Sequence, residues 1–332
     1  MNLKKYVPLF VYRAYMVIQT YCFDCRKTLK YSFCYRHEEE NLKANLVMVI
    51  HTVEKGLTMP HARTNFGHER ILDIIRLTNI ISDRYPTVDG SHCFEVLYAL
   101  ETLDDYIAFH WERKVVITPD ILKAIEDLAA KHSYTLQRTS FRQYRFTRET
   151  FFNGADADFC TFAKSRHTCR YYCDKEIPDE VFQKVAEIAQ TAPSSCNRQT
   201  CKFYVIKDLK LMDKVLAIQG GNRGFGETAT ATIVITSRLT AFSDVQERNQ
   251  PSINAGFYGM NILYALHYYH VGACVLNWAN TRKKDAALRR LLPQIHDEEQ
   301  ICMLISCGYP AANFDTALSK RKPTETNFEI IK

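Results

Sequence analysis

The pattern of apolar and polar positions changes near residue 159. From residue 38 to about 135, apolar residues recur at helical spacing, and turn residues divide the stretch into four segments. The first ends at Gly56, which suits a left-handed cap, and the second ends before Pro86. The third follows Asp89-Gly90-Ser91, and the fourth begins at the capping pair Thr118-Pro119. The predicted helices span residues 38–55, 68–85, 92–113 and 119–132. We expect a small helical bundle or a layer that wraps another domain.

Beyond residue 159, strand-like and helix-like segments alternate. Residues 228–237 are rich in β-branched types, as buried strands are. Helices are predicted at 179–191, 252–270 and 282–292, and strands at 202–207, 228–237, 272–278 and 300–307. This order predicts a sheet covered by helices. The polar, arginine-rich residues 133–158 separate it from the bundle, so we expect three parts: a basic amphipathic segment (1–36), a helical extension (37–150) and a sheet domain (159–332).

The first residues raise the question of a membrane-spanning helix. Residues 6–23 are mostly apolar, but Arg13 lies near their centre and tyrosines dilute them, which argues against a spanning helix. Their apolar positions have helical spacing, with basic residues on both sides. We expect this helix to pack on its own domain or on a partner subunit, because its tyrosines occupy several faces. The alternative is a weak contact with an anionic membrane surface.

Composition and charge exclude several classes of protein. Of 332 residues, 46% are hydrophobic and 24% charged, as in a folded globular protein. Residues 1–36 hold seven bases and one acid and so carry the entire formal charge of +6. The rest balances to zero, which excludes a general nucleic-acid-binding surface. Twelve cysteines without a signal peptide predict a reducing, cytoplasmic location. The single CxxC, Cys22–Cys25, has no second pair, so we expect no metal site.

Candidate chemistry begins at residues 165–170, Ser-Arg-His-Thr-Cys-Arg. Arg166 and Arg170, with His167 and the hydroxyl of Thr168, form a compact set of donors that suits a phosphate group. An arginine-rich loop can equally be a solvated or salt-bridged surface. After the next helix, the loop at 192–199 reads Ala-Pro-Ser-Ser-Cys-Asn-Arg-Gln. Its serines and asparagine could also form no more than a turn.

In combination, these segments resemble the FMN-dependent nitroreductase family, over about residues 159–325. In that family, Arg-Arg/His-Ser-x-Arg/Lys is followed by Ala-Pro-Ser-x-x-Asn-x-Gln-Pro. Three later elements also match in order: a long helix leading to a glycine-initiated strand at 252–278, Gly308-Tyr309-Pro310, and a basic element at 320–323. The resemblance implies an α+β fold of nitroreductase type, with a central sheet flanked by helices and an N-terminal mainly helical extension.

The resemblance also implies a set of FMN-binding residues. Arg166, His167, Thr168 and Arg170 would bind the phosphate and ribityl side, with Arg321 reaching the phosphate from the C-terminal segment. The isoalloxazine ring would lie against the loop and the end of the last-but-one strand, at Pro193, Ser194, Ser195, Asn197, Gln199, Asn277 and Trp278. Trp278 suits a core position as well as ring stacking. Thr200 stands where the family has proline, and Cys201 where it commonly has an aromatic residue, so the pocket wall there differs.

As a function, the resemblance implies an oxidoreductase in which electrons pass from NADH or NADPH through FMN to an unidentified small-molecule acceptor, in a ping-pong cycle. The cofactor carries the chemistry, so no catalytic side chain is expected. The family buries FMN between two subunits, which implies a homodimer. Two alternatives stay open: a flavoenzyme of this fold that acts on a biosynthetic intermediate without NAD(P)H, and a non-catalytic membrane-associated scaffold.

Two further motifs stand apart from the flavin pattern. The glycine-rich residues 220–226 precede a strand and lack a P-loop lysine, which argues against a nucleotide fingerprint. They form either a mobile loop over the active site or a flexible connection. His51 and Glu54 lie one helical turn apart in an apolar context. We expect them to join a buried ion-pair network that fixes the helical layer against the flavin domain, in preference to metal binding or acid–base work.

Overall fold

The computed structural model describes residues 8–32, 38–87 and 91–331, and these fall into two compact units. The sheet unit comprises the residues up to 20 and residues 145–316, and the helical unit comprises residues 21–144 and those from 317 on. This division differs from the expected one in three ways. The N-terminal segment, expected as a separate part, is divided between the two units at residue 20/21. The boundary lies at 144/145, and the C-terminal residues group with the helices because Lys320 and Lys322 form ion pairs with Glu101 and Glu95 there.

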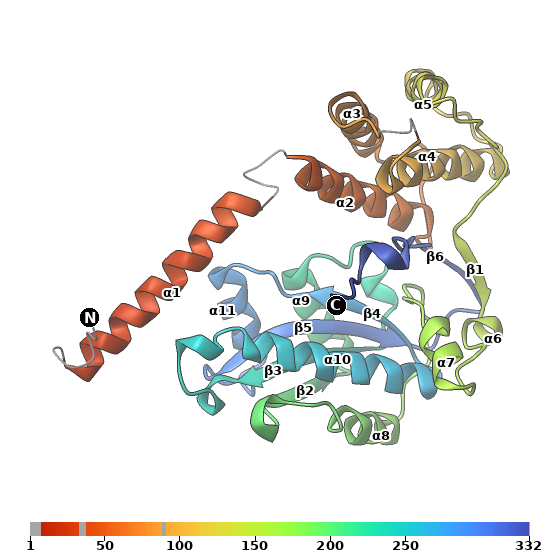
Figure 1. Ribbon diagram of the computed structural model, residues 1–332. Helices are drawn as coiled ribbons and strands as arrows, with labels where there is room; N and C mark the ends of the chain where they lie inside the picture. Colours follow the sequence, from red (N-terminus) through yellow and green to blue (C-terminus); the bar gives the residue numbers. More distant parts are fainter. Residues whose placement is uncertain (1–7, 33–37, 88–90, 332) are drawn as a thin grey trace. The chain divides into compact units, whose positions relative to one another are not determined.

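Within the helical unit, four helices pack around one apolar core (Figure 1). Leu46, Ile50, Ile71 and Leu103 in this core are fully buried. The four predicted helices are confirmed, with each end within two residues of its expected position. They are α2 (Glu39–Leu57), α3 (His68–Arg84), α4 (Phe94–Glu112) and α5 (Pro119–Lys131). The predicted turn at Asp89-Gly90 lies outside the described residues.

The cap predicted at Gly56 was wrong. The helix α2 continues through Leu57, and Gly56 does not have a positive φ. A Cβ atom at residue 56 would lie 2.2 Å from Cε2 of Phe66. Glycine therefore serves close packing here, because it lets the Phe66 ring approach the helix backbone. Thr118 does stand at the N-cap of α5, but its side chain makes no capping hydrogen bond.

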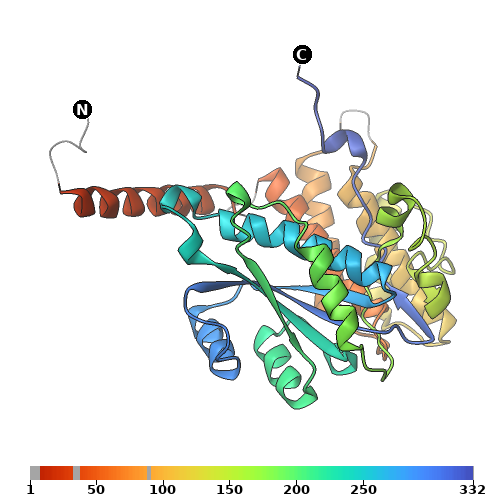
Figure 2. The same cartoon turned by 90° about the horizontal axis from the view of Figure 1, so that it is seen from below.

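The sheet unit contains a four-stranded antiparallel sheet in the order β2-β3-β5-β4. The helices α8 and α10 cover one face and α9 and α11 the other (Figure 2). A register shift between Ile235 and Thr236 leaves Cys302 of β5 as the extra residue of a β-bulge. The strands are β2 (Cys201–Ile206), β3 (Ala231–Arg238), β4 (Gly272–Asn277) and β5 (Glu299–Gly308), and the helices are α8 (Asp179–Ala189), α9 (Leu209–Gln219), α10 (Gln250–Tyr268) and α11 (Arg282–Leu291).

The predicted α+β class is confirmed, with each predicted strand and helix of this unit in place. Among the described residues, two strands and three α-helices were missed. Among them α9 has a clear start, because the Asp208 side chain accepts a hydrogen bond of 2.7 Å from Leu211 N. Two of the others pair as a separate small sheet. The remaining four are β1 (Tyr144–Thr147), α6 (Arg148–Phe151), α7 (Phe159–Ser165) and β6 (Asn313–Thr316).

The first described helix, α1 (Leu9–Tyr31), crosses the boundary between the two units. None of its side chains is fully buried, but Tyr12 and Met16 are half-buried and line a cavity together with residues 243–246 of the sheet unit, so the expected packing on its own domain is only partial. Among the described residues, no helix is both long enough and apolar enough to cross a membrane.

Candidate functional site

The segment that carries Arg166 and Arg170 follows α7 and runs beside β4. Cys169 N donates a hydrogen bond of 3.0 Å to Ala273 O. Cys169 is fully buried, whereas the two arginines on either side are half-buried, as expected for an extended segment along a sheet edge. A Cβ atom on Gly272 would lie 2.8 Å from Cys169 Cβ, so glycine in β4 allows this close approach.

Aromatic and hydroxyl groups surround the donor cluster. The Arg170 guanidinium lies 6.0 Å from the centre of the Phe225 ring, and Phe225 is buried. The His167 ring is 5.4 Å from that of Phe146. The Thr168 carbonyl accepts a hydrogen bond of 2.5 Å from Thr316 Oγ1. The predicted phosphate donors are thus held by β4, β6 and a loop that joins α9 to β3.

A buried histidine, His267, lies next to the segment that carries the donor cluster. His267 of α10 is 2% exposed, and its Nε2 lies 2.8 Å from Ser165 Oγ. Burial and, to a smaller extent, the neighbouring Arg166, His270 and His167 lower the pKa of His267 to about 4. His267 is therefore neutral at pH 7. The guanidinium charge of Arg166, a smaller cause of this lowering, would favour an anion at the cluster.

The loop at residues 193–199 has an unusual backbone. Cys196, Asn197 and Gln199 all have φ between 46° and 53°, the left-handed region that residues other than glycine seldom adopt. Ser194 Oγ accepts a hydrogen bond of 2.9 Å from Gln199 N, and Ser195 Oγ donates one of 2.8 Å to Gln250 Oε1. The two serines therefore hold the loop, while the amide side chains of Asn197 and Gln199 are exposed. Such backbone strain is found most often at binding sites.

Arg198, in the middle of this loop, is held by contacts with Ser195, Ala241 and Glu247. Its Nη1 donates a hydrogen bond of 2.7 Å to Ala241 O, and its guanidinium pairs with Glu247. Hydrogen bonds from Arg198 lower the pKa of Glu247 to about 2. The sequence pattern does not single out Arg198. The distant Glu247, about fifty residues along the chain, gives no local signal.

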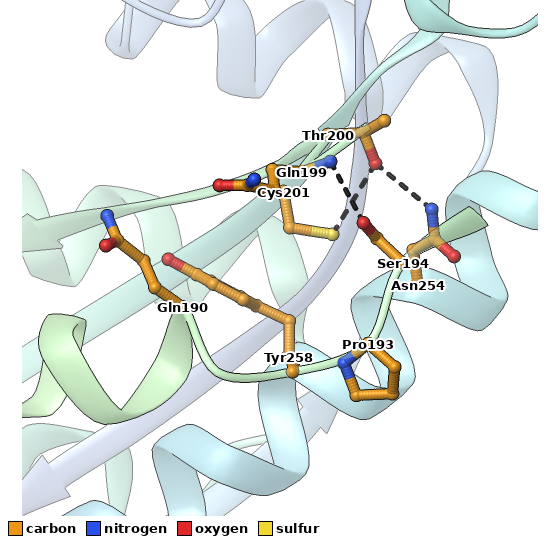
Figure 3. A pocket seen from close by; sticks show the side chains of 9 residues that line it. Gln190, Pro193, Ser194, Gln199, Thr200, Cys201, Asn254 and Tyr258 are labelled. Carbon is orange, nitrogen blue, oxygen red and sulfur yellow. Dashed lines mark hydrogen bonds between the residues drawn. The ribbon is translucent and has the colours of Figure 1, made fainter. Parts of the chain in front are cut away.

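A small cavity of about 90 Å³ opens beside the loop (Figure 3). The substitution of Thr200 for the family's proline has a structural explanation here. Thr200 Oγ1 shares a hydrogen bond of 2.8 Å with Ser237 Oγ and accepts one of 3.3 Å from Asn254 Nδ2. Burial raises the pKa of the neighbouring Cys201 thiol. The lining comprises Gln190, Ala192, Pro193, Ser194, Gln199, Thr200, Cys201, Asn254 and Tyr258.

Asn277 and Trp278 lie at the end of β4. Asn277 O accepts a hydrogen bond of 3.0 Å from Gln219 Nε2. Trp278 is half-buried, and its indole N–H donates a hydrogen bond of 3.3 Å to Asp285 Oδ1 of α11. This bond orients Trp278 toward α11, whichever role its ring has.

The glycine-rich loop connects these groups with Arg170. It begins after Gln219, which bonds to Asn277, and it contains Phe225, which lies against Arg170. The Asn222 side chain donates a hydrogen bond of 2.6 Å to Leu216 O, and Gly226 is buried. The loop is therefore a packed element of the site, and it places Arg170 and Asn277 on one side of the sheet unit.

Arg321 belongs to the helical unit and is exposed. The residues beside it are fixed there. Lys320 Nζ lies 2.6 Å from Glu101 Oε2, and Lys322 Nζ lies 2.7 Å from Glu95 Oε1. The contact of Arg321 with a phosphate therefore stays a prediction from the family resemblance.

His51 and Glu54 do join a buried network within the helical unit. Glu54 is fully buried, its Oε2 accepts a hydrogen bond of 2.6 Å from Tyr98 OH, and His51 Nδ1 lies 3.4 Å from it. Burial and then the charge of Glu54 raise the pKa of Tyr98. Tyr98 OH also accepts a hydrogen bond of 3.2 Å from Lys320 N, which ties the C-terminal segment to α4.

The predicted site residues of the sheet unit fall into two groups. The donor cluster and Asn277 lie along β4, at one edge of the sheet, whereas the loop at 193–199 leads into β2, at the other edge. Three strand spacings separate these edges, or about 14 Å. One chain thus presents two partial sites.

Comparison with known proteins supports the family resemblance of the region that holds these residues. Residues 163–220 and 213–309 match the nitroreductase family, a region that contains each predicted site residue except Arg321. A relative in Archaeoglobus fulgidus, provisionally named NADH dehydrogenase/NAD(P)H nitroreductase, is 26% identical over 148 residues, which are 44% of this chain and 82% of the relative. A relative of the same name in Methanothermobacter thermautotrophicus is 25% identical over 154 residues, 45% of this chain and 76% of its own.

Solved structures also align with the chain. One is a provisionally named nitroreductase from Desulfovibrio desulfuricans in complex with FMN. It has 23% sequence identity and a TM-score of 0.46, and the alignment covers 53% of this chain and 99% of that one.

Proposed function

We propose that this chain, whose residues 163–309 match the nitroreductase family, is an FMN-dependent oxidoreductase that uses NADH or NADPH as electron donor. The observation that carries this proposal is the charged donor pair Arg166 and Arg170, in the matched region and beside β4. The names of the two archaeal relatives also favour NAD(P)H as the donor. When bound, FMN supplies the capacity to accept a hydride and pass its electrons on.

The residues present suit the parts of this cofactor. Guanidinium groups at Arg166 and Arg170 can each donate charge-assisted hydrogen bonds to a phosphate. The buried His267 is neutral at pH 7, so the charge of this cluster comes from its guanidinium groups. At the other partial site, the exposed amides of Asn197 and Gln199 offer both donors and acceptors, as the edge of a flavin ring requires.

We further propose that the complete site forms between two copies of the chain. The cavity of about 90 Å³ is too small for a flavin, since ligand pockets usually enclose about 300–1,000 Å³. The two partial sites also lie at opposite sheet edges. Next to the cavity, α10 exposes Ile253 (44%) and Phe257 (50%), apolar side chains one turn apart that suit a contact with a second copy. A homodimer would bring the loop of one subunit to the donor cluster of the other.

A spectroscopic experiment tests the function. We expect the purified protein to be yellow, to release FMN on denaturation, and to lose its visible absorbance when NADH or NADPH is added without oxygen. Bound FMN that neither nucleotide reduces would favour the flavoenzyme that works without NAD(P)H. A protein that binds no flavin after reconstitution would contradict the proposal and favour a scaffold.

Substitution tests the assigned residues. Arg166→Ala removes a charge-assisted contact worth roughly 1.5–3 kcal/mol, so we expect FMN affinity to fall by about one to two orders of magnitude. Arg321→Ala should have a similar effect if the family's phosphate contact applies here. Lys164→Ala is the matched control, because Lys164 is an exposed cation two residues from Arg166. Equal flavin retention in all three variants would refute the assignment.

The subunit contact has its own test. Phe257→Glu places a charge on the exposed face of α10 and should convert dimer to monomer in sedimentation equilibrium, with loss of flavin. Val116→Glu is the control, because Val116 is 81% exposed in the helical unit. A Phe257→Glu protein that stays dimeric would argue against this interface.

We also propose a cytoplasmic location for the enzyme. Each cysteine among the described residues is a free thiol, and several of these thiols are buried. A reducing compartment keeps such thiols intact.

A further inference from the structure

The helix α1 carries a largely exposed apolar surface. None of its side chains is fully buried, although Tyr12, Met16 and Val17 line a cavity with residues 243–246 of the sheet unit. The helix is 23 residues long, which corresponds to about 34 Å. Its most exposed large side chains are Phe10 (74%), Ile18 (64%) and Tyr31 (60%), and Tyr21 is 56% exposed. Isolated exposed apolar residues are common, but a continuous apolar face on one helix indicates an interaction surface.

Most of the apolar residues of α1 form a stripe on one side of the helix, whereas Leu9, Phe23 and Tyr31 lie on the other side. At 100° per residue, Phe10, Val11, Ala14, Val17, Ile18 and Tyr21 lie within one stripe, which Cys22, Cys25 and Leu29 extend to the last turns. We call this set of nine residues the apolar stripe of α1. Of the half-buried residues of the helix, Tyr12, Met16 and Thr20 lie on the other side. The stripe is therefore directed away from these partly covered positions.

The charge of α1 helps to decide whether a second copy of the chain, the rest of the same chain or a lipid surface covers this stripe. The helix carries Arg13, Arg26, Lys27 and Lys30 against Asp24. A second copy of α1 would bring the same positive charge, and the remainder of the chain, which is neutral overall, offers no compensating excess of acids. An anionic lipid surface does offer the opposite charge along the whole length of the helix.

The side chains also have the distribution that a membrane surface selects. Valine, isoleucine, phenylalanine and tyrosine occupy the stripe, and none of the four bases lies within it. Lys27 and Lys30 lie over the rings of Phe23 and Tyr31, at 4.7 Å and 4.9 Å, so their stems cover apolar surface while their charges stay accessible. Arg13 near the middle of the apolar run favours a helix in the plane of the headgroups over one that spans the bilayer.

We propose that α1 is an interfacial helix that binds the surface of an anionic membrane, with its apolar stripe among the upper acyl chains. The enzyme would thereby work at the membrane surface. This inference does not depend on the identity of the cofactor.

Sedimentation of the full chain with vesicles tests the proposal. We expect binding to vesicles of phosphatidylcholine with about one third phosphatidylserine at physiological salt, little binding to phosphatidylcholine alone, and weaker binding as salt is added. Ile18→Glu should weaken binding about tenfold or more, because it places a charge within the stripe. The matched control is Gln19→Glu, which adds the same charge at an exposed position outside the stripe and should retain most of the binding.

Three results would overturn the proposal. The first is no binding to anionic vesicles, and the second is equal loss of binding in both variants. The third is a change of oligomeric state in Ile18→Glu alone, which would assign the stripe to a second copy. Flavin content, measured on the same samples, should not differ between the variants, so failure here is distinguishable from failure of the proposed oxidoreductase function.

Discussion

Acidification should destabilise the sheet unit through His267. This side chain is 2% exposed and lies among aromatic rings, with Phe152 at 5.6 Å and Phe162 at 5.4 Å. Burial, followed by Arg166, His270 and His167, lowers its pKa from 6.5 to about 4. Between these values the unfolded chain binds more protons than the folded one, so the free energy of unfolding falls as the pH falls. The full displacement corresponds to about 3 kcal/mol, of which about 2 kcal/mol should be lost between about pH 7.5 and pH 5.

The variant His267→Gln isolates this effect. Glutamine can still donate a hydrogen bond to Ser165 Oγ but does not titrate. Urea unfolding of the parent and the variant at both pH values should show that the variant loses less stability on acidification, by about 2 kcal/mol. His296→Gln is the control, since His296 is an exposed histidine of the same unit and is not among the groups that lower the pKa of His267. An equal acid-induced loss in the parent and in His267→Gln would refute the reasoning.

Two further substitutions test the packing of each unit by urea unfolding. In the helical unit, Arg142 pairs with the buried Asp104 (2.9 Å) and Asp105 (2.8 Å), so Arg142→Ala should cost about 3–5 kcal/mol, whereas Arg138→Ala, which breaks an exposed pair, should cost less than about 1 kcal/mol. Similar losses in the two variants would contradict this. In the sheet unit, Gly272→Ala should cost about 1–3 kcal/mol because its Cβ would meet Cys169, whereas Gly256→Ala in α10, with open space around it, should be neutral or stabilising. A neutral Gly272→Ala would show that Cys169 can move aside.

The long helices and strands could be predicted because the spacing of their apolar residues matches the positions that face the core. The helix α4 buries residues on almost every turn, and β3 is buried along nearly its whole length. The end of a helix was harder to predict where it depends on a single residue. Glycine is a common residue at helix caps, but at residue 56 it is required by the ring of Phe66, ten residues away. A local pattern does not contain that contact.

The candidate site was predictable in its residue types and not in its geometry. The family resemblance selects the segments at 166–170 and 193–199, yet nothing in either segment shows that they reach opposite edges of one sheet. Strand order, set by pairing between β3 and β5 about seventy residues apart, decides this. The contacts that support the loop could not be predicted from its own sequence, because Glu247 and Asn254 lie about fifty residues further along the chain.

Two partial sites in one chain have a thermodynamic consequence for the proposed enzyme. If FMN requires groups from both subunits, the cofactor binds the dimer and not the monomer, so flavin binding and dimerisation are linked. Linkage is reciprocal: a substitution that weakens the dimer weakens flavin affinity, and removal of flavin favours the monomer. Dilution of the flavin-free protein should therefore yield monomer at concentrations where the flavin-bound protein is still dimeric. Asn197, which lies outside the donor cluster of its own subunit, would then affect flavin binding without any change in that cluster.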